Sequence, residues 1–248
     1  MYRENIYDIV EATGQPISTL VIPKNTGLKG YAWKVLKEAG LNLDNAQKIS
    51  KIALRCGNLT ILLRRGEDIP QIVEDEYGTG RIVLGITGDD LFDEYRLRNS
   101  CNKLRVENTY NWYDDDARFK RPALSLVSRT GNLSDLPIEA RVAVNGKYEF
   151  NGRLYLSDNP LLVNRRFILK FYSGDLEAMV VNDTNNCCID IVYSGNTIET
   201  IDDEGLRVIE KIRFTDLVVI SPLRKEGPGL LEMKAREIPK GLIIDRTR

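Results

Sequence analysis

The sequence contains no histidine, and this absence narrows the chemistry that the chain can perform. Its 248 residues include no His at all and only four cysteines. Without histidine, Ser-His and Cys-His catalysis and histidine-ligated metal sites are excluded. Any reaction must therefore use carboxylates, Lys or Arg side chains, hydroxyls, backbone amides, or a hard cation held by oxygen ligands.

Several other features are scarce as well. The four cysteines form no CxxC pair, which argues against a zinc site and favours reduced thiols in a cytoplasmic protein. Lys and Arg (35) balance Asp and Glu (36), so the charge indicates neither a nucleic-acid nor a membrane partner. The apolar runs are too short to span a bilayer, and residues 1–16 lack the apolar core of a signal peptide.

Strand and helix patterns alternate along the first hundred residues. Strands are predicted at 18–24 and 59–65, helices at 28–40 and 68–78, and a strand, glycine turn and helix over 81–95. This order predicts a parallel sheet with right-handed crossovers. Residues 99–121 are polar and aromatic without a clear period, so we expect a loop there. A second block of strands is predicted at 122–128, 140–146, 167–174 and 187–195, with further β structure over 207–221.

Four loops that contain glycine follow predicted strands, at 23–27, 85–90, 173–177 and 194–197. Ligands of α/β proteins bind at the carboxyl ends of strands. Glycine lets the backbone approach a ligand, and successive amides and hydroxyls can then surround an anion. Each loop taken alone is better explained as a strand-to-helix turn that needs glycine, so the four together are the useful observation.

The order of these segments resembles the ATP phosphoribosyltransferase family, whose members catalyse the first step of histidine biosynthesis. "IPKNTGLKGYAWKVLKEAGL" is similar to the family's opening "lPKGrL…llerAGl", and "LLRRGEDIPQIVEDEYGTGRIVLGITGDDLFDE" to "lvRakDIPtyVedGaaDlGItGrDlL". "YSGDLEAMV" resembles the "GSvE" segment. "IDIVYSGNTI" resembles the phosphoribosyl-diphosphate loop "DlVeTGrTL", and "EGLRVIEKI" the "nGLvevEeI" that follows it.

The resemblance implies an α/β protein with two lobes, similar to type II periplasmic binding proteins, in which each lobe is a mostly parallel sheet flanked by helices. Residues 1–103 with 199–248 would form the first lobe, on the acceptor side. Residues 104–198 would form the second lobe, which would bind phosphoribosyl diphosphate (PRPP). The resemblance is to the short form of the family, which lacks a C-terminal regulatory domain. It implies an oligomer with a partner subunit that resembles histidyl-tRNA synthetase.

The reaction that the resemblance implies joins N1 of ATP to C1′ of PRPP as magnesium-bound pyrophosphate leaves. The nucleophile belongs to the substrate, so a site without histidine is suited to it. The 5′-phosphate would be held by Ser194, Gly195, Asn196 and Thr197, with Asp190 close to the ribose hydroxyls. The acceptor would contact Lys24, Arg65, Gly88 and Asp90. Asp190, Glu177 and Lys24 are the candidate catalytic residues, and Glu177 is the candidate Mg²⁺ ligand. Lys24, Arg65, Glu177 and Asp90 could each instead be a solvated surface charge. The alternative for 190–197 is a packing turn with a buried, hydrogen-bonded Asp190.

The chain departs from the family pattern on the acceptor side. Its first loop reads "KNTGL" and lacks the family's Arg, Val83 stands where the family has an acid, and "RVAVNGKYEF" lacks the Thr and Tyr-Pro of "RIATxYP". Transfer to a different base-like acceptor is therefore an alternative. A third possibility is a solute-binding module of the same fold without catalytic activity.

Overall fold

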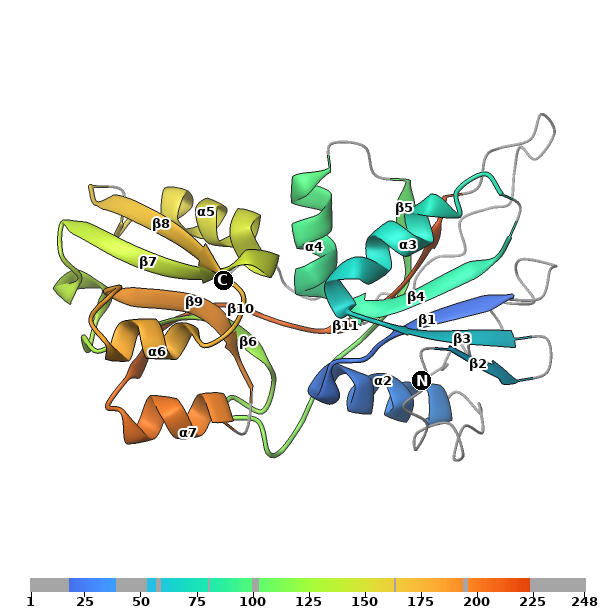
Figure 1. The fold of residues 1–248 in the computed structure, drawn as a ribbon, viewed down its shortest axis with the longest axis horizontal. Coiled ribbons are helices and arrows are strands. Elements are labelled where there is room, and N and C mark those ends of the chain that lie inside the picture. The colour runs from blue at the N-terminus through green and yellow to red at the C-terminus, as the bar shows by residue number, and fades with distance from the viewer. Residues whose placement is uncertain are drawn as a thin grey trace, which may run out of the picture.

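The computed structural model describes residues 18–38, 53–56, 59–79, 81–99, 103–162, 164–193 and 196–223, without the side chains of 54–56 and 196–198. They form two α/β lobes side by side (Figure 1). The strands are β1 Thr19–Pro23, β2 Ala53–Cys56, β3 Leu59–Arg64, β4 Val83–Gly88, β5 Leu104–Tyr110, β6 Ala123–Ser128, β7 Glu139–Asn145, β8 Arg166–Tyr172, β9 Cys187–Val192, β10 Arg207–Phe214 and β11 Leu217–Pro222. The α-helices are α2 Thr26–Glu38, α3 Ile69–Asp75, α4 Asp89–Arg98, α5 Glu149–Asp158, α6 Leu176–Val181 and α7 Asn196–Asp203. The 3₁₀ turns are η1 Gly66–Asp68, η2 Leu133–Asp135 and η3 Gly146–Tyr148.

The first lobe is built on a sheet with the strand order β2-β3-β1-β4-β11-β5. β1 is the parallel neighbour of both β3 and β4, as the strand–helix alternation predicts. β11 runs antiparallel to β4 and β5. All residues of β4 are buried, because α3 packs on one face of the strand and the larger apolar core, which includes α2, covers the other.

The second lobe is built on a sheet with the order β10-β6-β9-β7-β8. β7 lies between β8 and β9 and is parallel to both. β6 runs antiparallel to β9 and β10. In Figure 1, α5 lies over one face of this sheet and α6 and α7 over the other.

The two-lobed α/β fold is confirmed, and each lobe contains a mixed sheet flanked by helices. At one edge of the first sheet, β2 runs antiparallel to β3. The other antiparallel pairs result from the two crossings between the lobes, after β5 and after β10. β6 and β11 are the strands that begin just after a crossing, so they run away from the cleft between the lobes. The strands that end in loops at the cleft run in the opposite direction.

The division of the chain between the lobes also differs from the expected ranges, 1–103 with 199–248 and 104–198. β5 pairs with β11 in the first sheet, and β10 pairs with β6 in the second. Helix α7 leads into β10, and its Ile201 is buried in the apolar cluster of the second lobe. The crossings therefore fall at residues 111–122 and 215–216, since strand pairing holds β5 and β10 in these sheets.

β5 lies in a segment predicted to be a loop. It is an edge strand with a single neighbour, and several of its residues are exposed or half-buried. An edge strand needs no apolar alternation on both faces, so its sequence, "LRVENTY", carries a weak strand signal. Among the described residues, no helix is long and apolar enough to span a membrane.

β9 lies near the centre of the second sheet, and its two adjacent cysteines show that both faces are covered. Successive side chains of a strand point to opposite faces. Cys187 belongs to the larger apolar core and Cys188 to the cluster around Leu176 and Ile201, and both are fully buried. Burial raises the pKa of Cys187 to about 12 and that of Cys188 well above its ordinary value.

We therefore predict that Cys187 and Cys188 resist alkylation in the folded protein, because a buried thiol forms little thiolate. Iodoacetamide at mildly alkaline pH should label neither residue in native protein. Both should be labelled in guanidinium chloride, as read by mass spectrometry of the peptide that contains them. Rapid labelling of either cysteine in native protein would contradict the central position of β9.

Candidate active site between the two lobes

The carboxyl ends of six strands meet at one cleft. In the first lobe, β3, β1 and β4 are parallel neighbours, so their following loops lie along one sheet edge. In the second lobe the same holds for β8, β7 and β9. Two observations show that these edges face each other. A 320 Å³ cavity is lined by Arg65 of the first lobe and by Lys147 and Ser173 of the second, and a direct contact joins α2 to the end of β9.

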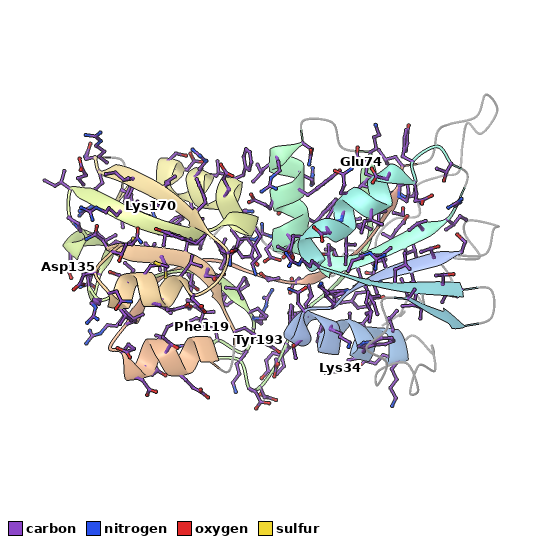
Figure 2. The ribbon with its side chains drawn as sticks, viewed as in Figure 1. Lys34, Glu74, Phe119, Asp135, Lys170 and Tyr193 are labelled. Atoms are coloured by element: carbon purple, nitrogen blue, oxygen red, sulfur yellow. The ribbon has the colours of Figure 1, made fainter. Side chains whose placement is uncertain are left out.

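That contact is between Gly27, in the first turn of α2, and Tyr193, which follows β9. A Cβ atom built on Gly27 would lie 2.6 Å from Cε1 of Tyr193. Glycine is therefore needed for this close approach unless the tyrosine ring moves. Tyr193 lies between the two lobes in Figure 2. The loops after β1 and β9, both selected from the sequence, thus lie side by side.

The loops of the first lobe are also bonded to one another. The backbone N–H of Gly66 donates to Asn25 Oδ1 at 3.2 Å, and the Thr87 hydroxyl donates to the Gly66 carbonyl at 2.8 Å. Since these residues stand at the ends of β1, β3 and β4, the three loops form one connected wall of the cleft.

Asp190, the candidate for the ribose hydroxyls, lies near the end of β9 and is partly buried. The Asn145 amide donates to both of its carboxylate oxygens, at 3.1 and 3.3 Å, and the Ile191 N–H donates at 2.8 Å. Burial raises the pKa of Asp190, while the charge of Lys147 and these hydrogen bonds oppose the rise. The carboxylate is therefore held in one orientation by its hydrogen bonds, one partner of which, Asn145, lines the 320 Å³ cavity.

Glu177, the candidate metal ligand, is in the first turn of α6, which packs on β9. Burial raises the pKa of Glu177, and the neighbouring carboxylates of Asp190 and Asp175 raise it further. No group of three His, Cys, Asp or Glu side chains among the described residues is arranged to hold a metal. Mg²⁺ is commonly bound by one or two carboxylates together with water and substrate phosphates. Glu177 and Asp190, which are close enough to interact, fit that kind of site.

The acceptor-side candidates lie in two different environments. Lys24 and Arg65 are exposed where β1 and β3 end, and Arg65 lines the 320 Å³ cavity. Gly88 and Asp90 are buried where α4 begins, and Asp90 is only 2% exposed. The structure therefore places Lys24 and Arg65 within reach of a ligand, and Gly88 and Asp90 behind the surface.

Asp90 instead connects the lobes. The Tyr148 hydroxyl of the second lobe donates to Asp90 Oδ2 at 2.7 Å, and Asp90 Oδ1 has no partner among the described residues. Burial raises the pKa of Asp90, and the hydrogen bond from Tyr148 opposes the rise. Contact between Asp90 and an acceptor remains a prediction.

The predicted phosphate loop is only partly described. Ser194 and Gly195 lie outside the described residues, as do the side chains of Asn196 and Thr197. The backbone of Asn196 and Thr197 begins helix α7, directly after β9. The strand, loop and helix order is therefore the predicted one, and phosphate binding by these four residues remains a prediction.

Helix α4 joins the first lobe to the second along one face. Asp90, Glu94 and Arg98 are four residues apart, so they lie on the same side of the helix. The Glu94 carboxylate accepts from the backbone N–H groups of Phe150 at 2.8 Å and Asn151 at 2.9 Å, and from the Asn151 amide at 2.8 Å. It thereby caps the N-terminus of α5 in the other lobe, where a negative charge is stabilising.

Further contacts surround this cap. Arg98 donates to the Gly146 carbonyl at 3.3 Å and its guanidinium lies 5.8 Å from the Phe150 ring centroid. On β10, Arg213 donates to Asp93 at 2.7 Å and to Asp89 at 2.8 Å. We name the contacts of Glu94, Asp90 and Arg98 with residues 146–151 the α4–α5 clasp.

The two crossing segments are hydrogen-bonded to each other through Asp216. Its carboxylate accepts from the Trp112 N–H at 3.1 Å and from Arg121 at 2.7 Å, so it ties residues 111–122 to 215–216. Trp112 is stacked on Tyr31 and packs edge-on against Tyr193, with ring centroids 5.4 and 5.2 Å apart. A second cavity, of 530 Å³, adjoins this aromatic group.

Sequence reasoning missed four residues that shape the cleft: Asn145, Lys147, Tyr148 and Glu94. The first three lie in "VNGKYEF", which was considered only for what it lacks. An Asn-Gly pair directly after a predicted strand was a usable signal, because it marks a turn at the carboxyl end of that strand. Glu94 carried no signal, since its partners are more than fifty positions away in the chain.

Comparison with known proteins gave concordant matches. The model of the family described as HisG, ATP phosphoribosyltransferase, matches residues 65–235. ATP phosphoribosyltransferase from Schizosaccharomyces pombe is 26% identical over 208 residues, and the same enzyme from Metallosphaera sedula is 25% identical over 210. The alignments cover 80% and 81% of this chain but only 63% and 64% of those relatives' lengths.

A solved structure shares the fold. The ATP phosphoribosyl transferase (HisG:HisZ) complex from Thermotoga maritima contains a chain that superposes with a TM-score of 0.59 at 17% identity. The match covers 83% of this chain and 88% of that one.

The clasp gives a stability prediction. Replacing Glu94→Gln removes the charge and puts an amide group against two backbone donors, so the free energy of unfolding should fall by about 1–3 kcal/mol. Glu139→Gln is the matched control, because Glu139 forms only an exposed ion pair with Arg166 at 3.2 Å, a kind of pair that contributes at most about 1 kcal/mol. Urea unfolding of both variants makes the comparison. An equal, small change in the two variants would contradict the clasp.

Proposed function

Since the family model matches more than half of it, this chain belongs to the ATP phosphoribosyltransferase family, and we propose that it transfers the phosphoribosyl group of PRPP to ATP. The observation that carries the proposal is the position of Asp190. It lies in the second half of β9, shortly before the loop that resembles the family's PRPP segment, and it is hydrogen-bonded to Asn145, which lines the 320 Å³ cavity. The products are phosphoribosyl-ATP and pyrophosphate, and the reaction is the first step of histidine biosynthesis.

The second lobe would hold PRPP. The carboxylate of Asp190 would accept hydrogen bonds from the ribose hydroxyls, in the orientation that Asn145 gives it. The loop 194–197 would surround the 5′-phosphate with backbone N–H groups and hydroxyls, where helix α7 begins. The sugar would then be fixed with C1′ directed toward the first lobe.

The first lobe would hold ATP so that its N1 approaches C1′. In the transfer, the N1–C1′ bond forms as the bond from C1′ to the pyrophosphate oxygen breaks, and the electron pair leaves with pyrophosphate. No side chain acts as nucleophile, so positioning and charge stabilisation supply the rate enhancement. Lys24 and Arg65 are the exposed basic groups of this wall that would contact the acceptor.

Glu177 and Asp190 would hold Mg²⁺ together with substrate oxygens. When bound, the ion neutralises charge on the departing pyrophosphate. The raised pKa values of both carboxyls, caused first by burial, indicate that nearby positive charge would stabilise their ionised forms.

We also propose that the chain works with a second subunit resembling histidyl-tRNA synthetase. The support is the fold shared with a chain of the Thermotoga maritima HisG:HisZ complex. The activity assay described next, run with and without such a subunit, tests this part: equal rates would argue against it.

The assay combines the chain with Mg²⁺, PRPP and ATP and measures pyrophosphate and phosphoribosyl-ATP. Asp190→Asn should lower kcat/KM by about a hundredfold, because two charge-assisted hydrogen bonds to ribose are weakened. Asp135→Asn, on the outer surface of the second lobe (Figure 2), should leave activity unchanged. If pyrophosphate is released only with another base-like acceptor, that acceptor would replace ATP in the proposal. No release with any acceptor, but tight PRPP binding, would favour a binding module.

A second prediction concerns the acceptor. Lys24 lies in a loop without the family's neighbouring arginine, and a lysine cannot form the bidentate contact of an arginine. We therefore expect weak ATP binding that depends on Lys24, and Lys24→Met should reduce it on the order of tenfold. PRPP affinity should hardly change, because PRPP would bind to the other lobe.

Separate calorimetric titrations of ATP and PRPP into this variant, with Mg²⁺, make the measurement. Equal losses for both ligands would move Lys24 to the diphosphate of PRPP. No loss for either would make it a surface lysine.

A further inference from the structure

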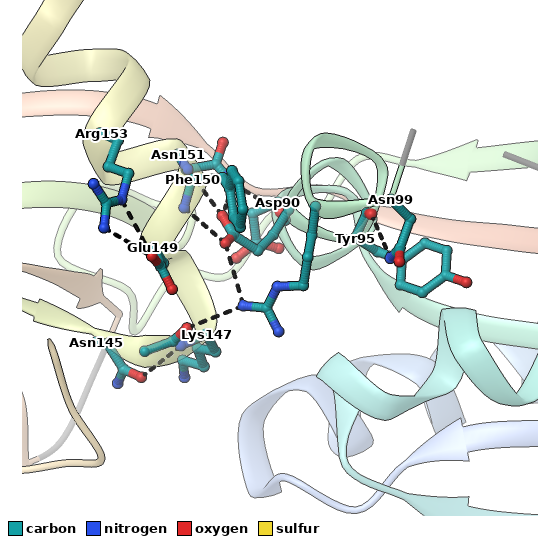
Figure 3. Close-up of polar contacts among 12 residues, drawn as sticks. Asp90, Tyr95, Asn99, Asn145, Lys147, Glu149, Phe150, Asn151 and Arg153 are labelled. Carbon is teal, nitrogen blue, oxygen red and sulfur yellow. Dashed lines mark hydrogen bonds and ion pairs between the residues drawn. The ribbon is translucent and has the colours of Figure 1, made fainter. Parts of the chain in front are cut away.

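Lys147 stands on a turn that is fixed from both sides. It lies in η3, which follows β7, and its N–H donates to Asn145 Oδ1 at 3.3 Å. The residue before it, Gly146, accepts from Arg98, and the residue after it, Tyr148, donates to Asp90. The clasp therefore holds the backbone of Lys147 at the border of the two lobes, as Figure 3 shows.

The side chain of Lys147 brings a positive charge close to Asp190. Its ammonium lies 5.1 Å from the Tyr148 ring centroid, and its charge lowers the pKa of both Asp190 and Asp90 against the larger effect of burial. In the strand register Val144 is level with Ile189, so Asn145 is level with Asp190. Lys147 is two residues further along, in the turn that follows β7, and it lines the same cavity as Arg65 of the first lobe.

Within the part of the chain that the structure describes, Lys147 has no close ion pair, unlike three arginines near the lobe boundary. Arg98, Arg121 and Arg213 are each within 4.0 Å of a carboxylate. Among the described residues no carboxylate lies within that distance of the Lys147 ammonium, although the side chain lines the 320 Å³ cavity. Its three N–H donors are therefore available to an anion in that cavity.

We propose that Lys147 binds the diphosphate group of PRPP. The inference rests on the proposed function, which places the ribose hydroxyls at Asp190 and the 5′-phosphate at 194–197. The diphosphate is attached at C1′, the carbon next to one of those hydroxyl-bearing carbons. An anion beside Asp190 and directed toward the first lobe therefore meets Lys147. As the C1′–oxygen bond breaks, negative charge grows on the diphosphate, and the ammonium stabilises it.

The experiment separates the diphosphate from the rest of PRPP. PRPP, pyrophosphate and ribose 5-phosphate are each titrated, with Mg²⁺, into wild type, Lys147→Met, Lys147→Arg and Lys170→Met. Lys170 is the matched control, because it is exposed on the outer part of the second lobe (Figure 2). Lys147→Met should weaken PRPP and pyrophosphate by about tenfold to a hundredfold, since a charge-assisted hydrogen bond is lost. Ribose 5-phosphate should be unaffected, Lys147→Arg should retain most affinity, and Lys170→Met should match wild type.

Two results would overturn the inference while leaving the proposed function intact. If Lys147→Met binds PRPP as tightly as wild type, the diphosphate does not contact Lys147. If ribose 5-phosphate weakens as much as PRPP, Lys147 acts by positioning Asp190 and not by binding the diphosphate. A wild-type chain that binds neither PRPP nor pyrophosphate would overturn the proposed function, and this inference with it.

Discussion

The carboxylate of Glu94 at the N-terminus of α5 is the contact on which the geometry of the cleft depends. It accepts three hydrogen bonds from the other lobe and is almost fully buried. A helix N-terminus has N–H groups without partners inside the helix, and burying them without an acceptor is unfavourable. Here the acceptor comes from a different lobe, so the cap of α5 and the arrangement of the lobes are one interaction.

The consequences of this cap reach the candidate catalytic residues through the chain. α5 begins directly after η3, so fixing its first turn also fixes Asn145 and Lys147. Asn145 then orients the Asp190 carboxylate on the neighbouring strand. A chain of contacts thus links Glu94 of the first lobe to Asp190 of the second. Asp216 also helps to fix the arrangement of the lobes, because it bonds the two crossing segments to each other.

The chemistry that we propose is consistent with a chain without histidine. In a transfer where the substrate supplies the nucleophile, the protein has to orient two anionic substrates and stabilise the charge of the leaving group. Carboxylates, basic side chains, backbone amides and a substrate-bound Mg²⁺ are sufficient for these tasks. The strand ends provide these groups from both sides of the cleft. In each lobe, three parallel strands end toward the other lobe.

The sequence by itself determined the local elements and the family. The apolar periods at 18–24, 28–40 and 187–195 correspond to β1, α2 and β9, and the order of the motifs identified the family that the comparison then confirmed. It also selected Arg65, which lines the 320 Å³ cavity, as a candidate contact of the acceptor. These features depend on residues close together in the chain, so a pattern of a few positions is enough to predict them.

Only the tertiary structure decided which segments pair and which charged side chains remain available to a ligand. The placement of β5 and β10, the burial of Asp90 against Tyr148 and the clasp of Glu94 on α5 each join residues far apart in the sequence. No periodicity encodes such a pairing, because it depends on how two folded surfaces fit together. Asp90 and Lys147 show the difference: the sequence made Asp90 a candidate acceptor contact and gave no prediction for Lys147. The approach of the lobes buried the first against a tyrosine and left the second facing a cavity.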